Sequence, residues 1–348
     1  MRTCCTLTAA LVIGLPFQLF AQDVPASPGT RLPAYARTIE LPGLAPPAER
    51  FIPSPNALHN IMITGYWPPT NEMIREFSNN LVQNPGGWIG GNWEGRGYNV
   101  YAYFPEFPNG LNKGEGDFEV DYQDTSGDWW PLIDVVKPVA IITFSRASNN
   151  QDWEMEGGNR TYESSQWTND YLVPLKPTPE LPIMIHEPPL TERFSSLPMQ
   201  AIVDAVDVQV PALNPFISPI DNGRFLSNFI GYHGNWTKLL NEAPGDPERI
   251  VAAGHIHVGW AMTLANAQLA AKISVRTLIT HVDFLLAGDM NCDRTPDLAD
   301  VDPFVQALLD PDGYNAAHPN CNINRADVNL DTQLDGLDIL ALVERLAP

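Results

Sequence analysis

The last sixty residues repeat one template of acidic and amide side chains, and this repeat constrains the fold more than any other feature. The template D-x-N-x-D-x-x-x-D-x-x-D occupies 289–300 and again 327–338. An apolar-periodic helix is predicted directly after each copy, over 301–309 and 339–346. A disordered acidic tail would not repeat five oxygen-bearing side chains in register and then supply two amphipathic helices. We therefore predict a small all-α unit over 288–348.

Oxygen donors at this spacing are what Ca²⁺ requires. The ion takes six to eight oxygens, and a twelve-residue loop supplies them from positions 1, 3, 5, 7, 9 and 12, position 7 through its backbone carbonyl. The predicted ligands are Asp289, Asn291, Asp293, Thr295, Asp297 and Asp300 in the first loop, and Asp327, Asn329, Asp331, Gln333, Asp335 and Asp338 in the second. The unit also holds twelve Asp/Glu against three Lys/Arg. Ca²⁺ is thus the predicted cofactor.

Two departures from an ordinary calcium loop predict weak affinity, which extracellular calcium would tolerate. Position 6 is usually Gly because the chain turns sharply there, but here it is Arg294 and Thr332. Position 12 is Asp instead of Glu. The duplicated loop and helix over roughly 288–346 resembles type I dockerin modules, which share Asp at position 12. That resemblance implies an EF-hand-like module that binds a cohesin-like protein partner.

The N-terminus has the pattern of a secretory signal peptide over 1–22. Arg2 precedes an apolar run from Leu7 to Phe20, and Ala21 offers a small residue for cleavage. An uncleaved anchor is the alternative, because Arg2 is the only charge before the run. We predict an exported protein, secreted or held at the cell surface. Residues 23–58 contain eight prolines and indicate a linker or an extended arm.

The cysteines are consistent with export. Cys4 and Cys5 would leave with the signal peptide, whereas Cys292 and Cys321 lie in the acidic unit. In an oxidising compartment these two are expected to form a disulfide, with two free thiols as the alternative. Closing a loop of this length would stabilise the unit by about 3–4 kcal/mol.

The charge of the chain excludes two classes of partner. The formal net charge is −21 over 348 residues. Nucleic acids and anionic membrane surfaces are bound through Lys/Arg patches, so neither is expected as a partner. Beyond the signal segment we predict no membrane-spanning stretch.

The region 59–287 alternates short buried strands with helices, which predicts a three-layer α/β domain around a parallel sheet. The predicted strands are 60–66, 98–104, 138–144, 210–216 and 249–258, and the predicted helices are 72–81, 130–136, 197–206, 222–236 and 264–286. The segment 145–180, rich in Asn, Ser, Trp and Pro, is predicted to be mostly loop.

Chemistry in this domain must come from residues other than cysteine, since there is none between 23 and 288. His255 and His257 lie at the end of a predicted buried strand, where α/β sheets present their ligands. A zinc site built on these two histidines would need a third ligand, and the spacing of the other residues in the sequence does not indicate one. Histidines with satisfied hydrogen bonds in the core are the alternative.

Five segments of this domain, in order, resemble pyroglutamyl peptidase I, also called pyrrolidone-carboxylate peptidase. They are HNIMITGYWPPTNE, VAIITFS followed by DWEMEGGN, RFSSLPMQAIVDAV, ISPIDNGRFLSNFIGYH and AAGHIHVGW. The resemblance covers about 58–285. It implies an αβα domain of the pyroglutamyl-peptidase kind that hydrolyses the amide bond after an N-terminal pyroglutamate, or a related amide bond of a peptide.

The resemblance also assigns roles to single residues. Ser227, in NGRFLSN, stands where the family has its cysteine nucleophile, and His257 matches the general base. Glu154, with Asn159 five residues later, matches the acid that orients the histidine, although Glu156 competes for that role. Tyr66 matches an aromatic residue of the substrate pocket, whereas Pro69 replaces a second one.

A serine in place of the cysteine leaves several interpretations open. A thiol is readily held as thiolate, whereas a serine must lose its proton during attack. The domain is thus predicted to be a hydrolase with a converted nucleophile, or a pseudoenzyme that serves as a surface-associated binding protein. Ser227 could also be a helix-surface serine in a misaligned segment. In a more remote alternative, the dockerin-like unit attaches the protein to a polysaccharide-degrading assembly.

Overall fold

In a computed structural model of the chain, residues 59–178, 187–221, 223–319, 321–331 and 333–347 are described. The predicted signal peptide (1–22) and Pro-rich linker (23–58) lie outside the described residues. No helix in the described part of the chain is long and apolar enough to cross a membrane.

Four parallel strands form one side of the sheet in the order β2-β1-β5-β9, with β2 at the edge. They are β1 (His59–Thr64), β2 (Tyr98–Tyr103), β5 (Pro138–Arg146) and β9 (Ala252–Val258). Nearly every residue in them is buried, because helices cover both faces, and such strands are therefore continuous apolar runs. The predicted α/β fold class is confirmed.

The sheet is mixed, because three further strands extend it beyond β9. They are β6 (Asp152–Arg160), β7 (Glu192–Phe194) and β8 (Asn214–Asp221). β6 runs antiparallel to β9 and β7 and parallel to β8.

The prediction that 145–180 is mostly loop is wrong at β6. Three acidic residues and two glycines hide the strand in the sequence. The structure needs these glycines because a Cβ at Gly158 would lie 2.6 Å from the carbonyl oxygen of Arg193, on the neighbouring strand β7. The glycines of β6 are therefore explained by the close approach of the β6 and β7 backbones and not by a loop.

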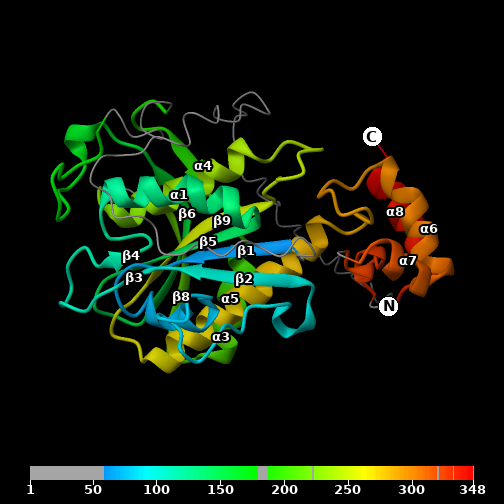
Figure 1. Cartoon of the computed structure of the whole chain (residues 1–348), viewed down its shortest axis with the longest axis horizontal. Coiled ribbons are helices and arrows are strands. Elements are labelled where there is room, and N and C mark those ends of the chain that lie inside the picture. Colours follow the sequence, from blue (N-terminus) through cyan, green and yellow to red (C-terminus); the bar gives the residue numbers. More distant parts are fainter. Residues whose placement is uncertain (1–58, 179–186, 222, 320, 332, 348) are drawn as a thin grey trace, which may run out of the picture.

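Helices cover the two faces of the sheet (Figure 1). α1 (Tyr122–Val136) and α4 (Leu226–Leu240) pack on one face, while α3 (Met199–Gln209) and α5 (Leu264–Leu285) pack on the other. The two faces bury separate apolar clusters, because side chains alternate along each strand. Short elements complete the domain: η2 (Glu72–Phe77), η3 (Trp93–Gly95), β3 (Pro105–Glu106), β4 (Glu115–Gly116) and η4 (Ser164–Gln166).

Three helix predictions differ clearly in extent. The predicted helix 222–236 is α4, which begins and ends four residues later. The predicted helix 72–81 is the short 3-10 helix η2, which ends at Phe77. The predicted helix 130–136 is the last half of α1. This helix begins eight residues earlier because the side chain of Asp121 accepts hydrogen bonds from the backbone N–H groups of Gln123 and Asp124.

The C-terminal unit is a helical module at one end of the sheet (Figure 1). It contains η5 (Leu298–Asp300), α6 (Val301–Leu309), α7 (Pro311–Ala317), η6 (Ile323–Ala326) and α8 (Asp338–Leu346). Its own small core is centred on Met290, Phe304, Tyr314 and Leu342. The predicted disulfide between Cys292 and Cys321 is present.

The module is docked on the α/β domain through Arg294, at position 6 of the first loop. Its guanidinium is buried and donates to the carbonyl oxygens of Lys137 (2.7 Å), Pro138 (3.2 Å) and Arg249 (2.9 Å). These carbonyls lie where β5 and β9 begin. The module therefore sits at the amino ends of the parallel strands, and His257 lies at their carboxyl ends, roughly 26 Å along the extended chain from Arg249.

Candidate functional site

An acid–histidine pair lies at the carboxyl end of β9. His257 Nδ1 donates to Glu156 Oε1 on the antiparallel strand β6, at 2.6 Å. The second oxygen of Glu156 accepts from Asn159 Nδ2 at 2.8 Å. Only 2% of the Glu156 side chain is exposed, so the carboxylate is fixed by two partners in a nearly dry environment. With Nδ1 engaged, Nε2 is the ring nitrogen that can meet a nucleophile.

Glu154 was predicted to be the acid that contacts His257, but in the structure Glu156 makes the close contact. Glu154 lies directly opposite His257 in the strand ladder, yet its carboxylate is 3.8 Å from Nδ1 and a quarter of its side chain is exposed. Glu156, opposite His255, reaches diagonally and makes the shorter contact. Glu154 and Glu156 are two residues apart on one strand and therefore lie on the same face of the sheet. Sequence spacing alone does not show which of the two carboxylates contacts His257.

The charges around His257 favour its protonated form. Burial acts to lower the pKa of His257, but the carboxylate of Glu156, with Asp221 and Glu154 further away, raises it to about 9. Burial also raises the pKa of Glu156, against the effect of its histidine partner. At neutral pH the ring is therefore an imidazolium.

His255 is a structural residue. It is fully buried, with Nδ1 2.7 Å from Thr143 Oγ1 and Nε2 2.8 Å from Ser145 Oγ. Burial and the neighbouring His257 lower its pKa, so the ring is neutral. Glu156 supplies the third ligand that a zinc site lacked in the sequence, since donor atoms of Glu156, His255 and His257 lie within 4.8 Å of one another. Both nitrogens of His255 are nevertheless already engaged, so this set does not fit a metal as it stands.

Ser227 is the second residue of α4 and is half-buried. Its neighbour Asn228 joins the helix to the end of β6: the side-chain oxygen accepts from Arg160 N, and the side-chain nitrogen donates to Arg160 O. One turn later Gly231 packs on Asn159, where a Cβ would lie 2.6 Å from the amide nitrogen. α4 is thus fixed over the strand that carries Glu156. Among the described residues, no hydrogen bond joins Ser227 to His257.

Tyr66 lies in the core. It is 2% exposed, and its hydroxyl lies 2.5 Å from Thr125 Oγ1. Burial raises its pKa well above the ordinary value. Its ring therefore does not face solvent as the predicted substrate contact would.

Sequence reasoning missed an aromatic group at the same end of the sheet. Arg146, the last residue of β5, has its guanidinium 5.7 Å from the ring of Trp67 and 5.0 Å from that of Trp260. Trp67 also packs on Phe225, which immediately precedes α4. Nothing in the sequence indicated this group, because its members come from four separate elements.

The two loops of the module share a set of internal hydrogen bonds. The carboxylate at position 12, Asp300 or Asp338, accepts backbone N–H groups of positions 2, 3 and 9. The carboxylate at position 5, Asp293 or Asp331, accepts the N–H of position 7. These hydrogen bonds give both segments the same loop conformation, with the backbone N–H groups directed at the carboxylates of positions 5 and 12.

The donor sets fit Ca²⁺ in chemistry, since both loops offer oxygens only. In neither loop do three carboxylates of the described residues bring oxygens within 4.8 Å of one another. The loops differ at position 1. Asp289 is fully buried and paired with Arg325, whereas Asp327 is half-buried.

These observations define the protein as a mixed-sheet α/β domain, with an acid–histidine pair at its carboxyl edge, joined to a helical module of two acidic loops. Among solved structures, a mutant pyrrolidone carboxyl peptidase from the hyperthermophile Pyrococcus furiosus is similar at TM-score 0.45 and 15% identity, over 64% of this chain and 99% of that chain.

Two further solved structures are similar to this chain. The pyrrolidone carboxyl peptidase from Thermococcus litoralis has TM-score 0.44 and 16% identity, over 65% of this chain and 96% of that chain. Pyroglutamyl peptidase I of Bacillus amyloliquefaciens has TM-score 0.42 and 14% identity, over 64% of this chain and 98% of that chain. No family model and no curated protein matches the chain.

Proposed function

We propose that this chain is an exported hydrolase of N-terminal pyroglutamyl or related amide bonds, with Ser227 as nucleophile, His257 as base and Glu156 as the residue that orients the base. The observation that carries the proposal is the buried contact of 2.6 Å between Glu156 and His257, because this is the acid–base half of a catalytic triad. The five segments quoted above, in their order, support the substrate class.

The proposed reaction is acyl transfer through a covalent intermediate. Ser227 Oγ attacks the amide carbon while His257 Nε2 takes the hydroxyl proton, and Glu156 stabilises the imidazolium. The histidine then returns the proton to the departing amine. Water, activated by the same nitrogen, releases the acid and restores Ser227. The N-terminus of α4, close to Ser227, favours the negative charge that develops on the carbonyl oxygen.

The pKa of His257 has a consequence for this reaction. A base must be neutral to accept a proton, whereas His257 with a pKa of about 9 is mostly protonated at pH 7. A serine enzyme of this geometry works better as the pH approaches 9. A thiol at the same position would instead be stabilised as thiolate by the imidazolium at neutral pH.

A second candidate function is that of a non-catalytic binding protein. It is favoured by a specific observation: within the described residues Ser227 has no hydrogen bond to His257. In that case the paired His257 and Glu156 stabilise the sheet edge, and the domain binds its ligand without cleaving it.

We further propose that the C-terminal module binds Ca²⁺ and attaches the protein to a cohesin-like partner. The support is an apolar groove of about 270 Å³ between α6 and α8. Its exposed side chains include Leu309 (81%) and Val343 (58%). Exposed apolar surface of this kind is typical of a binding face. The groove lies on a module docked at the end of the sheet opposite His257.

One experiment separates the two functions of the domain. Release of a fluorophore from a pyroglutamyl amide is measured for the wild-type protein, Ser227→Ala and Ser227→Cys. The hydrolase proposal expects turnover that is lost in Ser227→Ala and gains a neutral-pH component in Ser227→Cys. Absence of turnover in the wild-type protein would favour the binding protein, and equal non-zero rates in wild type and Ser227→Ala would refute Ser227 as the nucleophile.

A further inference from the structure

The first calcium loop contains a cation of its own. Arg325 Nη1 donates to Asp289 Oδ2 at 2.6 Å, and this carboxylate belongs to position 1 of the loop. The two side chains are 2% and 0% exposed. Guanidinium stays protonated at every pH that proteins experience. The residue whose negative charge would first attract a metal ion is therefore already paired with a full positive charge.

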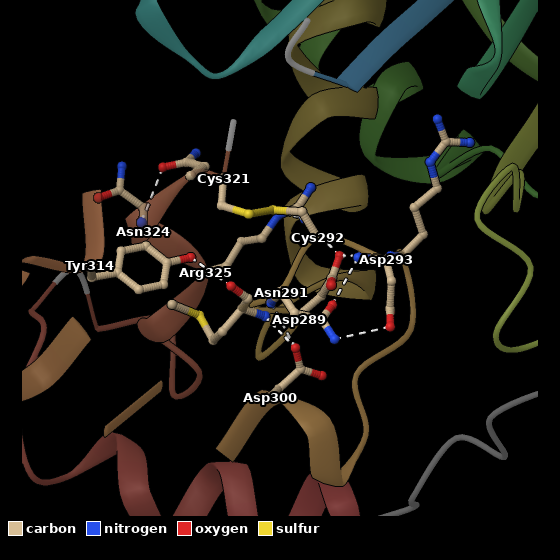
Figure 2. Close-up of a disulfide and its surroundings, with 12 residues drawn as sticks. Asp289, Asn291, Cys292, Asp293, Asp300, Tyr314, Cys321, Asn324 and Arg325 are labelled. Atoms are coloured by element: carbon tan, nitrogen blue, oxygen red, sulfur yellow. Dashed lines mark hydrogen bonds and ion pairs between the residues drawn. A yellow bond between two sulfur atoms is a disulfide. The ribbon is translucent and has the colours of Figure 1, made fainter. Parts of the chain in front are cut away.

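Arg325 is fixed in this place by its surroundings. Its backbone carbonyl accepts from the N–H of Gly288 at 2.7 Å, directly before the loop begins. The same Nη1 lies 3.5 Å from Cys292 Sγ, in the disulfide that joins the loop to Cys321 (Figure 2). The guanidinium is thus buried between the Asp289 carboxylate and the disulfide.

An ion entering the first loop would meet the remaining oxygen of Asp289. Oδ1 is buried and has no hydrogen-bond partner among the described residues. An ion bound there would share one carboxylate with Arg325. Repulsion between a divalent ion and a guanidinium at that range, in a site shielded from water, is large enough to weaken binding by about 100-fold or more.

The shape of the first loop depends on contacts other than an ion. Arg294, at position 6, is held by three backbone carbonyls of the α/β domain, and the hydroxyl of Thr295, at position 7, accepts from Gly245 N at 2.7 Å. The disulfide adds a covalent link. In the second loop, by contrast, Asp331 is exposed and Asp335 half-buried.

We infer that the first loop is an arginine-neutralised joint between module and domain, and that the module takes a single Ca²⁺, in the second loop. The inference rests on the proposed calcium function. It distinguishes two loops that follow the same sequence template. It also gives a docking role to Arg294, which replaces the glycine usual at position 6.

The test is calcium titration of the full chain by calorimetry, with Asp293→Asn and Asp331→Asn as matched variants. The two residues occupy position 5 of their loops and accept the same local hydrogen bonds. The inference expects one site, with its affinity retained within about threefold in Asp293→Asn and lost in Asp331→Asn. In amide NMR spectra, calcium should shift residues 327–338 and leave 289–300 in place.

The alternative outcomes have separate meanings. Two sites of similar affinity, or one site abolished by Asp293→Asn, would overturn the inference and leave the calcium module standing. No binding by the wild-type protein at millimolar calcium would contradict the proposed calcium function itself, and this inference with it.

Discussion

Replacing Glu156 by Gln should lower the pKa of His257 from about 9 to below its ordinary value of 6.5. In the wild-type protein, burial lowers this pKa and the Glu156 carboxylate raises it. Because one pKa unit corresponds to about 1.4 kcal/mol, the net effect favours the imidazolium by a few kcal/mol. Gln keeps the shape and one oxygen but removes the charge, so burial, the largest single effect on this pKa, is then opposed only by Asp221 and Glu154.

The matched control is Glu154→Gln. Glu154 lies 3.8 Å from the ring with a quarter of its side chain exposed, and its charge is partly screened. Removing that charge should therefore lower the pKa of His257 by less than about 1. The measurement is NMR titration of the His257 ring protons in the three proteins between pH 5 and pH 10. A larger change in Glu154→Gln than in Glu156→Gln would refute the assignment of Glu156 as the partner.

The same change predicts a pH-dependent stability difference. The folded-state pKa of His257 is raised, so the stabilisation is fully present below pH 6.5 and is lost as the pH rises through about 9. Denaturant unfolding should show wild type more stable than Glu156→Gln at pH 6 to 7 and show this difference shrinking by pH 10. A difference that grew with pH would contradict the sign of the argument.

The remaining predictions concern the nucleophile, the joint and the disulfide. Any hydrolysis by the wild-type protein should increase between pH 7 and pH 9, whereas the Ser227→Cys variant should reach its plateau at lower pH; superimposable pH–rate profiles would count against His257 as the base. Arg294→Ala should lower the free energy of unfolding by about 3–5 kcal/mol, because three buried carbonyls lose a charged donor. Denaturant unfolding checks this, and a loss under 1 kcal/mol would mean that other contacts dock the module. Reducing Cys292–Cys321 should cost the module about 3–4 kcal/mol, measured by unfolding with and without reductant; identical curves would contradict it.

Several parts of the candidate site were predictable from the sequence because they depend on local pattern. The buried strand that ends at His257 is a continuous apolar run between turn residues, and the helix that carries Ser227 has clear apolar periodicity. The pairing of Cys292 with Cys321 followed from compartment and number. The residue that holds His257 was not predictable, since Glu154 and Glu156 differ only in which carboxylate reaches across the ladder.

In the paired acidic loops, too, some features follow from local sequence pattern and others depend on tertiary contacts. Their template, their spacing and the helices after them are properties of the chain alone, because ligand spacing and helical period are local. Whether the two loops are equivalent is a tertiary matter. Arg325 meets Asp289 across 36 residues, and Arg294 reaches carbonyls more than 40 residues away in sequence. The sequence by itself determined two oxygen-rich loops and an α/β domain; only the packing of module on domain decided which carboxylates are already neutralised, because charge pairing depends on distance in space.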